Sequence, residues 1–184
     1  MAENLKEILN DDLKQAMRGG DTVRRSVIRQ ALAAIQNAEM ARRATLAKAA
    51  FANQSKSAAA DKEPELSSDD IAAIAKQAAL ENSDIVGVVA KEARQRQESI
   101  EAFKQGNRPD LMAKEEAELA ILQEYLPKQM SRAEIVAEAR KIIEAAGAKG
   151  LGDKGKVMPK IIAELKGKAD GREINEVVTD LLKA

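Results

Sequence analysis

The sequence predicts an all-α protein, and three observations lead to this prediction. Alanine, lysine, glutamate, leucine and arginine dominate the composition, whereas aromatic residues make up only 2 % of it. Apolar side chains recur at spacings of three and four rather than alternating, which is the period of a helix. Glycines and prolines separate these periodic stretches. With 184 residues, of which 45 % are apolar, the chain can form one compact domain or two small ones that share an interface.

The first two helices are expected to form a hairpin. A stripe of apolar residues begins at Leu5, and Gly19-Gly20 ends that helix. The stripe includes Met17, and Asp21 can cap the next helix, whose stripe begins at Val23.

The second helix then enters an alanine-rich segment. Residues 41–62 hold nine alanines and few large apolar side chains. Since alanine costs no side-chain entropy, this segment can extend the second helix; since it can bury little, it can equally be a mobile linker. We favour an extension that frays near Asn53, with Pro64 ending any helix there.

Two further helices are expected before the middle of the chain. Ser67–Asp70 opens a short helix that runs to Ala79 or Glu81. Ser83-Asp84 caps a longer one, which stops where Gly106 and Pro109 break it.

The next helix is acidic on one face. Asp110 is its expected cap and Pro127 its end. Its carboxylates could be read as metal ligands, but without histidine, and with a lysine at position 114, a solvated face is the better interpretation. The carboxylates concerned are Glu115, Glu116, Glu118 and Glu124.

A separate group of helical patterns follows Pro127. Ser131 and Glu134 form a capping box, and the helix they open ends at Gly147. After a glycine-rich connector, two more apolar stripes run through residues 157–165 and 174–182. Three helices in about 55 residues, each with one apolar face, are typical of a small three-helix unit. We therefore expect an N-terminal helical domain at 1–126, with an alanine-rich insertion at about 41–82, and a C-terminal three-helix domain at 127–184.

The composition excludes several kinds of site. The chain has no cysteine and no histidine, so it lacks thiolate chemistry and the commonest general base and metal ligand. We predict no catalytic residue, no metal and no cofactor. Three aromatic residues cannot build the stacking platform of a single-strand binder. The start of the chain is acidic and unlike a signal peptide, and no apolar run approaches the roughly 20 residues of a membrane span, so we expect a cytoplasmic location and no membrane contact.

The strongest candidate for a site is a basic segment near the C-terminus. The whole chain balances 30 basic against 30 acidic residues, yet between positions 154 and 172 six cations face only Glu164 and Asp170. Gly167 as a helix stop and Asp170 with Glu173 as a capping box explain the turn, but they do not explain the cations. A phosphate backbone is a plausible partner, and an ordinary solvated surface is the equally weighted alternative. The candidate nucleic-acid-binding residues are Lys154, Lys156, Lys160, Lys166, Gly167, Lys168, Gly171 and Arg172.

Two other features of the sequence suggest phosphate binding. Gly150 stands at the right distance from Gly155-Lys156 for a phosphate loop, but Val157 replaces the required hydroxyl and the segment follows a helix, so we reject a nucleotide site. A second basic stripe either assists phosphate binding or pairs with the acidic helix. It consists of Arg24, Arg25, Arg29, Arg42 and Arg43.

Several segments together resemble the GatB/YqeY domain family. The resemblance lies in Tyr125-Leu126-Pro127, in Gly155-Lys156-Val157-Met158 and in the turn from Lys166 to Gly171. The segments "EARQRQESIEAFKQGNRPDL" and "NDDLKQAMRGGDTVRRSVIRQAL" are also similar to the family's middle and N-terminal helices. The chain is most similar to the stand-alone YqeY-like members.

The resemblance implies a function connected with tRNA. The same domain forms the tail of the B subunit of the glutamyl/aspartyl-tRNA amidotransferase, where it helps to grip the tRNA elbow. We therefore expect a non-catalytic tRNA-binding module. The alternatives are an adaptor that docks on an amidotransferase subunit or an aminoacyl-tRNA synthetase, and an enzyme of the class that family naming suggests, a carbon–nitrogen ligase with glutamine as amido-N-donor.

Overall fold

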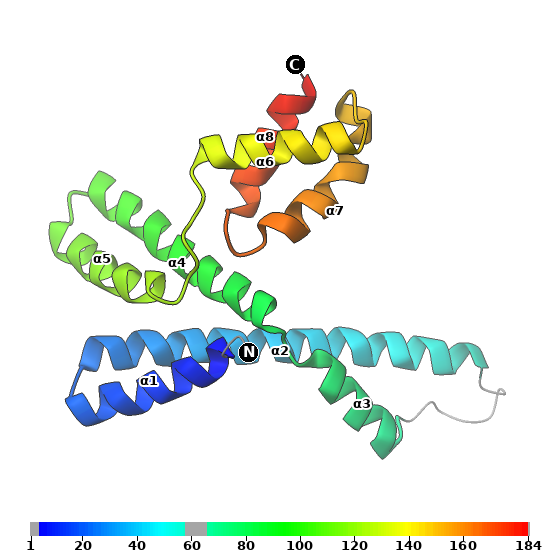
Figure 1. The fold of residues 1–184 in the computed structure, drawn as a ribbon. Coiled ribbons are helices and arrows are strands. Elements are labelled where there is room, and N and C mark those ends of the chain that lie inside the picture. The colour runs from blue at the N-terminus through cyan, green and yellow to red at the C-terminus, as the bar shows by residue number, and fades with distance from the viewer. Residues whose placement is uncertain (1–3, 58–65, 184) are drawn as a thin grey trace. The chain divides into compact units, whose positions relative to one another are not determined.

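The fold is all-α, as predicted. The structure is a computed structural model, and it describes residues 4–57 and 66–183, within which there are helices and no strand. The helices are α1 (Leu5–Gly19), α2 (Thr22–Ser57), α3 (Ser68–Ala78), α4 (Asn82–Gln105), α5 (Pro109–Gln123), α6 (Arg132–Ala145), a short 3-10 helix η1 (Leu151–Asp153), α7 (Lys154–Leu165) and α8 (Gly171–Lys183) (Figure 1). They form two compact units, Met1–Val88 and Val89–Ala184. The boundary between these units falls inside α4, and the expected domain boundary at 126/127 stays a prediction.

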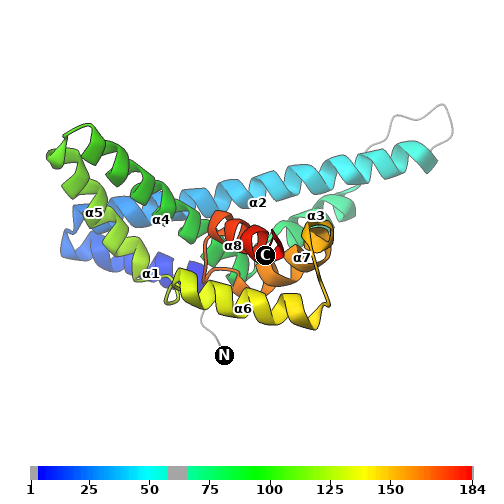
Figure 2. The same cartoon turned by 90° about the horizontal axis from the view of Figure 1, so that it is seen from above.

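The hairpin of α1 and α2 is the centre of the first unit. Gly20 closes it in the left-handed conformation, with φ of 73°, and its amide donates to the Ala16 carbonyl. The two helices lie side by side in both views (Figures 1 and 2). Their buried side chains are Leu5, Leu9, Ala16, Val27, Ile28, Ala31 and Ile35.

Two residues predicted to face inward on this hairpin are exposed instead. Met17 is 60 % exposed and Val23 is 45 % exposed. Both flank the turn at Gly19-Gly20, where the chain leaves one helix and enters the next. The apolar spacing that predicted them thus continues beyond Ala16 and Val27, the buried residues nearest to the turn.

The alanine-rich segment extends α2, as we favoured, but the helix continues to Ser57 rather than fraying near Asn53. It packs against α3, which buries Ile74 and Ala78. Ser67 and Asp70 form the capping box of α3. The rest of the expected insertion includes residues 58–65, which lie outside the described residues.

Two helix starts differ from their predicted caps by one or two residues. α4 begins at Asn82, and Asp84 lies in its first turn, where it pairs with Arg42 at 3.2 Å. α5 begins at Pro109, with Asp110 in its first turn. Proline suits the first helical position because its missing N–H has no partner there in any helix.

The predicted solvated face is confirmed only in part: Glu116 and Glu124 are exposed, whereas Glu115 and Glu118 pack against α4. Glu118 is buried, and its carboxylate lies 3.1 Å from Nε of Arg96 on α4; Glu115 lies 3.5 Å from the same guanidinium. Lys114 contributes a longer contact of 4.0 Å to Glu118. A buried carboxylate needs such a partner because water no longer solvates it. The charges on α5 therefore join it to α4.

The last three helices surround one apolar cluster, as predicted. The Ser131–Glu134 capping box opens α6, and each helix contributes one face to the cluster. The cluster is built from Ile135, Ala139, Ile143, Val157, Ile161, Leu165, Ile174, Val177, Val178 and Leu182. This cluster fixes α7 and the turn after it, which carry the candidate site. None of the described helices is long and apolar enough to cross a membrane.

Candidate nucleic-acid interface

The turn between α7 and α8 is held by the segment that follows α5. Gly167 is buried and adopts the left-handed conformation, with φ of 77°. Its carbonyl accepts a hydrogen bond from Nε2 of Gln129 at 3.0 Å, and the carbonyl of Lys168 accepts one from the Met130 amide at 2.8 Å. The residues that follow Tyr125–Pro127 therefore lie against the turn at 166–171, and Gly167 has a structural role.

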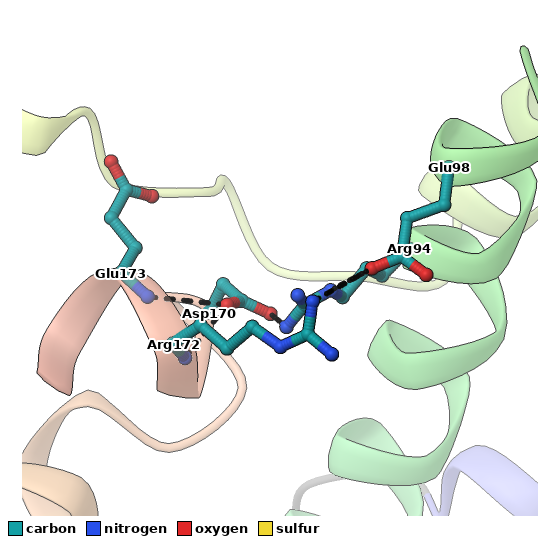
Figure 3. A network of polar contacts seen from close by, with 5 residues as sticks. All are labelled: Arg94, Glu98, Asp170, Arg172 and Glu173. Atoms are coloured by element: carbon teal, nitrogen blue, oxygen red, sulfur yellow. Dashed lines mark hydrogen bonds and ion pairs between the residues drawn. The ribbon is translucent and has the colours of Figure 1, made fainter. Parts of the chain in front are cut away.

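Asp170 is the carboxylate of this turn, and both of its oxygens are engaged. Oδ1 accepts from the backbone amides of Arg172, at 2.8 Å, and Glu173, at 3.2 Å, and so caps α8, which is the part of the predicted capping box that Asp170 supplies. Oδ2 pairs with the guanidinium of Arg94 from α4 (Figure 3). The negative charge of the turn is thus matched by Arg94.

Glu98, one turn after Arg94, extends this network. Its Oε1 accepts from Nε of Arg94 at 3.0 Å and from a terminal nitrogen of Arg172 at 3.4 Å (Figure 3). Burial alone would lower the pKa of Arg94, but the hydrogen bonds and charges of Glu98 and Asp170 outweigh it, so the pKa is raised above its ordinary value. Arg94 is fully charged, and it ties α4 to the start of α8.

The structure divides the six predicted cations into two groups. Lys154 is half-buried and donates to the Thr179 hydroxyl at 2.8 Å, which ties α7 to α8. Arg172 reaches Glu98. These two cations hold the fold together as well as carrying charge.

The other four cations are exposed on α7 and the turn. Lys156 and Lys160 lie one helical turn apart, on the side of α7 away from its buried stripe. Lys156 pairs with Asp153 at 3.0 Å, which, with a hydrogen bond from the Lys149 amide, lowers the pKa of Asp153. Lys160 and Lys168 form no ion pair with any residue that the structure describes, and Lys166 is exposed between them in the chain.

Gly171 has no structural need to be a glycine. It is the first residue of α8, its φ is not positive, and, apart from its own helix and chain neighbours, no atom of the described residues lies within 4 Å of the position that a Cβ would occupy. The space beside it is open to a ligand backbone.

Arg94 is the member of this network that sequence reasoning missed. It lies 76 positions from Asp170, and no local spacing links the two.

The glycine-rich connector before α7 is largely helical. It contains η1 and the first turn of α7, so Gly155 is helical and no phosphate loop forms. Among the described residues, no group of three or more carboxylates could hold a metal ion.

Comparison with known families decides the relationship of the chain. A family model described as "Yqey-like protein" matches residues 65–182, which is more than half of the sequence. The chain belongs to the YqeY-like protein family. The YqeY-like match includes Tyr125–Pro127, the Gly155–Met158 segment and the turn at 166–171, whereas α1 and α2 precede it. No curated protein was found to match the chain.

Proposed function

We propose that this YqeY-like protein binds folded tRNA without catalysing a reaction on it, and that α7 and the following turn contact the phosphate backbone. The observation that carries the proposal is the group of exposed lysines, Lys156, Lys160, Lys166 and Lys168, on a chain of zero net charge. An ammonium group held near a phosphate adds affinity without reading the base sequence.

The interactions of the nearby carboxylates support this proposal. The charge of Asp170 is already matched by Arg94, and its other oxygen caps α8. The pair of Lys156 with Asp153 is on the surface, with the lysine side chain 80 % exposed, and pairs of this kind contribute little and exchange readily. The open backbone at Gly171 favours close approach of a second backbone. The resemblance to the amidotransferase tail points to the same ligand.

The test is a binding titration with labelled tRNA, followed by fluorescence anisotropy at several salt concentrations. The wild-type protein should bind at low salt, with an affinity that falls steeply as salt rises. Charge reversal in the double variant K166E/K168E should weaken binding strongly. The matched control is K104E/K141E, which makes the same change of charge on α4 and α6 in the same unit. Equal weakening by both pairs, or no binding by the wild type at low salt, would remove the proposal.

A second candidate, a protein-interaction adaptor, is favoured by one observation. Leu151 is 48 % exposed and Ile162 is 45 % exposed, and Met158 is half-buried one helical turn before Ile162. A contiguous patch of exposed apolar side chains marks a docking surface, and this candidate requires that Leu151, Met158 and Ile162 form one. Under this candidate, the purified amidotransferase subunits or the synthetase would bind the wild type in nuclease-treated solution, and I162E would abolish binding. Retention of tRNA binding by I162E would separate the two candidates.

A further inference from the structure

Helix α2 carries the largest local charge imbalance in the chain. Its 36 residues contain Arg24, Arg25, Arg29, Arg42, Arg43, Lys48 and Lys56, against one acidic residue, Glu39. Seven positive charges less one negative charge give α2 a net charge of +6, although the whole protein has a net charge of zero. The remainder of the chain is therefore acidic by six charges. The helix also lies outside the residues that match the YqeY-like family.

The arginines of α2 fall into two structurally different sets. Arg24 lies 3.9 Å from Asp21, and Arg42 lies 3.2 Å from Asp84, so these two have carboxylate partners in the first unit. The arginines that directly follow them in the sequence, and Arg29, belong to the second set. Arg25, Arg29 and Arg43 are exposed, and none of them forms an ion pair with a residue that the structure describes.

The three arginines without carboxylate partners share one line along the helix. Arg25, Arg29, Gln36 and Arg43 follow one another at spacings of four, seven and seven, which keeps them within about 40° around a helix of 3.6 residues per turn. The line is about 27 Å long at 1.5 Å per residue. The buried residues Val27, Ile28, Ala31 and Ile35 point to another side, against α1.

Gln36 and Arg43 line a cavity beside α2. The other residues that line this cavity, of about 310 Å³, are Lys6, Glu39 and Met40 of the α1–α2 hairpin, two alanines of α3 and Ala79, which follows α3. In this cavity Lys6 lies 2.8 Å from Glu39, so the only acidic side chain of α2 is already engaged. The carboxylate therefore does not compete for the arginines on the line.

We infer that this line of Arg25, Arg29 and Arg43, which we call the α2 arginine line, is a second binding site for the phosphate backbone of RNA. Guanidinium groups bind phosphate oxygens through two parallel hydrogen bonds, and they lose less hydration than ammonium groups in doing so. Three of them on a rigid helix span several phosphates of a folded RNA. Because aromatic side chains are so few in this chain, the contact reads the position of phosphates and not the identity of bases. This inference rests on the proposed function and adds a site in the first unit.

The test uses the full-length protein and labelled tRNA, and compares two double variants that differ by one position at each site. R25Q/R43Q removes two members of the α2 arginine line. R24Q/R42Q removes the same two charges from the neighbouring positions, whose arginines pair with Asp21 and Asp84. Because every substituted side chain is on the surface or paired there, circular dichroism should show helix content unchanged in both variants.

The salt dependence of binding provides the readout. In R25Q/R43Q the slope of log K against log salt should become shallower by about 2, that is by about 1 for each lost phosphate contact. In R24Q/R42Q the slope should change by less than half as much. Equal changes in the two variants would show a diffuse field in place of a site, and an unchanged slope in R25Q/R43Q would show that α2 does not touch the RNA; either result overturns the inference.

The outcome for the C-terminal lysines separates this inference from the proposed function. If K166E/K168E weakens binding and R25Q/R43Q does not, the proposed function is supported and the inference that the α2 arginine line binds RNA is refuted. If R25Q/R43Q weakens binding and K166E/K168E does not, the α2 arginine line stands and the C-terminal site falls. If the wild type does not bind tRNA at low salt, both fall.

Discussion

Replacing Gly167 by alanine is expected to destabilise the second unit. Gly167 has φ of 77° and is buried, and its carbonyl accepts the Gln129 side chain. An alanine in the left-handed region costs roughly 1–2 kcal/mol, because Cβ approaches the neighbouring carbonyl oxygen. For a unit of this size, such a cost lowers the midpoint of thermal unfolding by roughly 5–15 °C. Thermal and urea unfolding, followed by far-ultraviolet circular dichroism, would measure it.

Gly171→Ala is the matched control, four residues away in the same turn. Its φ is not positive, its Cβ would meet nothing within 4 Å, and it begins α8. Alanine should therefore stabilise the protein by about 0.4–1 kcal/mol, chiefly by restricting the unfolded chain. The two variants should shift the unfolding midpoint in opposite directions. Equal destabilisation, or a neutral Gly167→Ala, would refute the role assigned to the left-handed turn.

Two further predictions concern charged groups that hold helices in place. Glu118→Gln should lower the free energy of unfolding by about 2–3 kcal/mol, because the largely buried Arg96 loses its charged partner at 3.1 Å, while Glu115 lies farther away at 3.5 Å. A urea midpoint within error of wild type would contradict the buried pair. The Ser131 amide and hydroxyl lower the pKa of Glu134, so the stability that this carboxylate contributes is present above its ordinary value of 4.5 and is lost as the pH falls through the lower folded value. Ser131→Ala should cost about 1 kcal/mol at neutral pH, and the stability difference between wild type and variant should shrink in acid; a difference independent of pH would count against the capping box.

Features set by neighbouring residues could be predicted from the sequence, and those set by distant contacts could not. The capping box of Ser131 with Glu134 is a local pattern, and it has the expected form. Glu118 was expected in solvent because its own helix gives no sign of Arg96, 22 positions earlier in the chain. Met17 failed for a different reason: its spacing fits a buried stripe, but its side chain is exposed at the end of the hairpin.

The candidate site shows the same division. The excess of cations between 154 and 172 is visible in the sequence, and so is the role of Gly167 as a helix stop. The sequence could not show that Lys154 is used against Thr179, or that Arg94 takes up the charge of Asp170. Both depend on which helices become neighbours.

The contacts of Gln129 and Met130 bear on how the last three helices would be isolated for study. A fragment that starts at Pro127 keeps the side chain and the amide that cover the carbonyls of Gly167 and Lys168. A fragment that starts at Ser131, where the helical capping box would suggest a natural beginning, leaves both carbonyls bare and frees the loop that carries Lys166 and Lys168. The short connector after α5 is therefore an integral part of the C-terminal fold, and an expressed fragment should begin before this connector, at Pro127 or earlier.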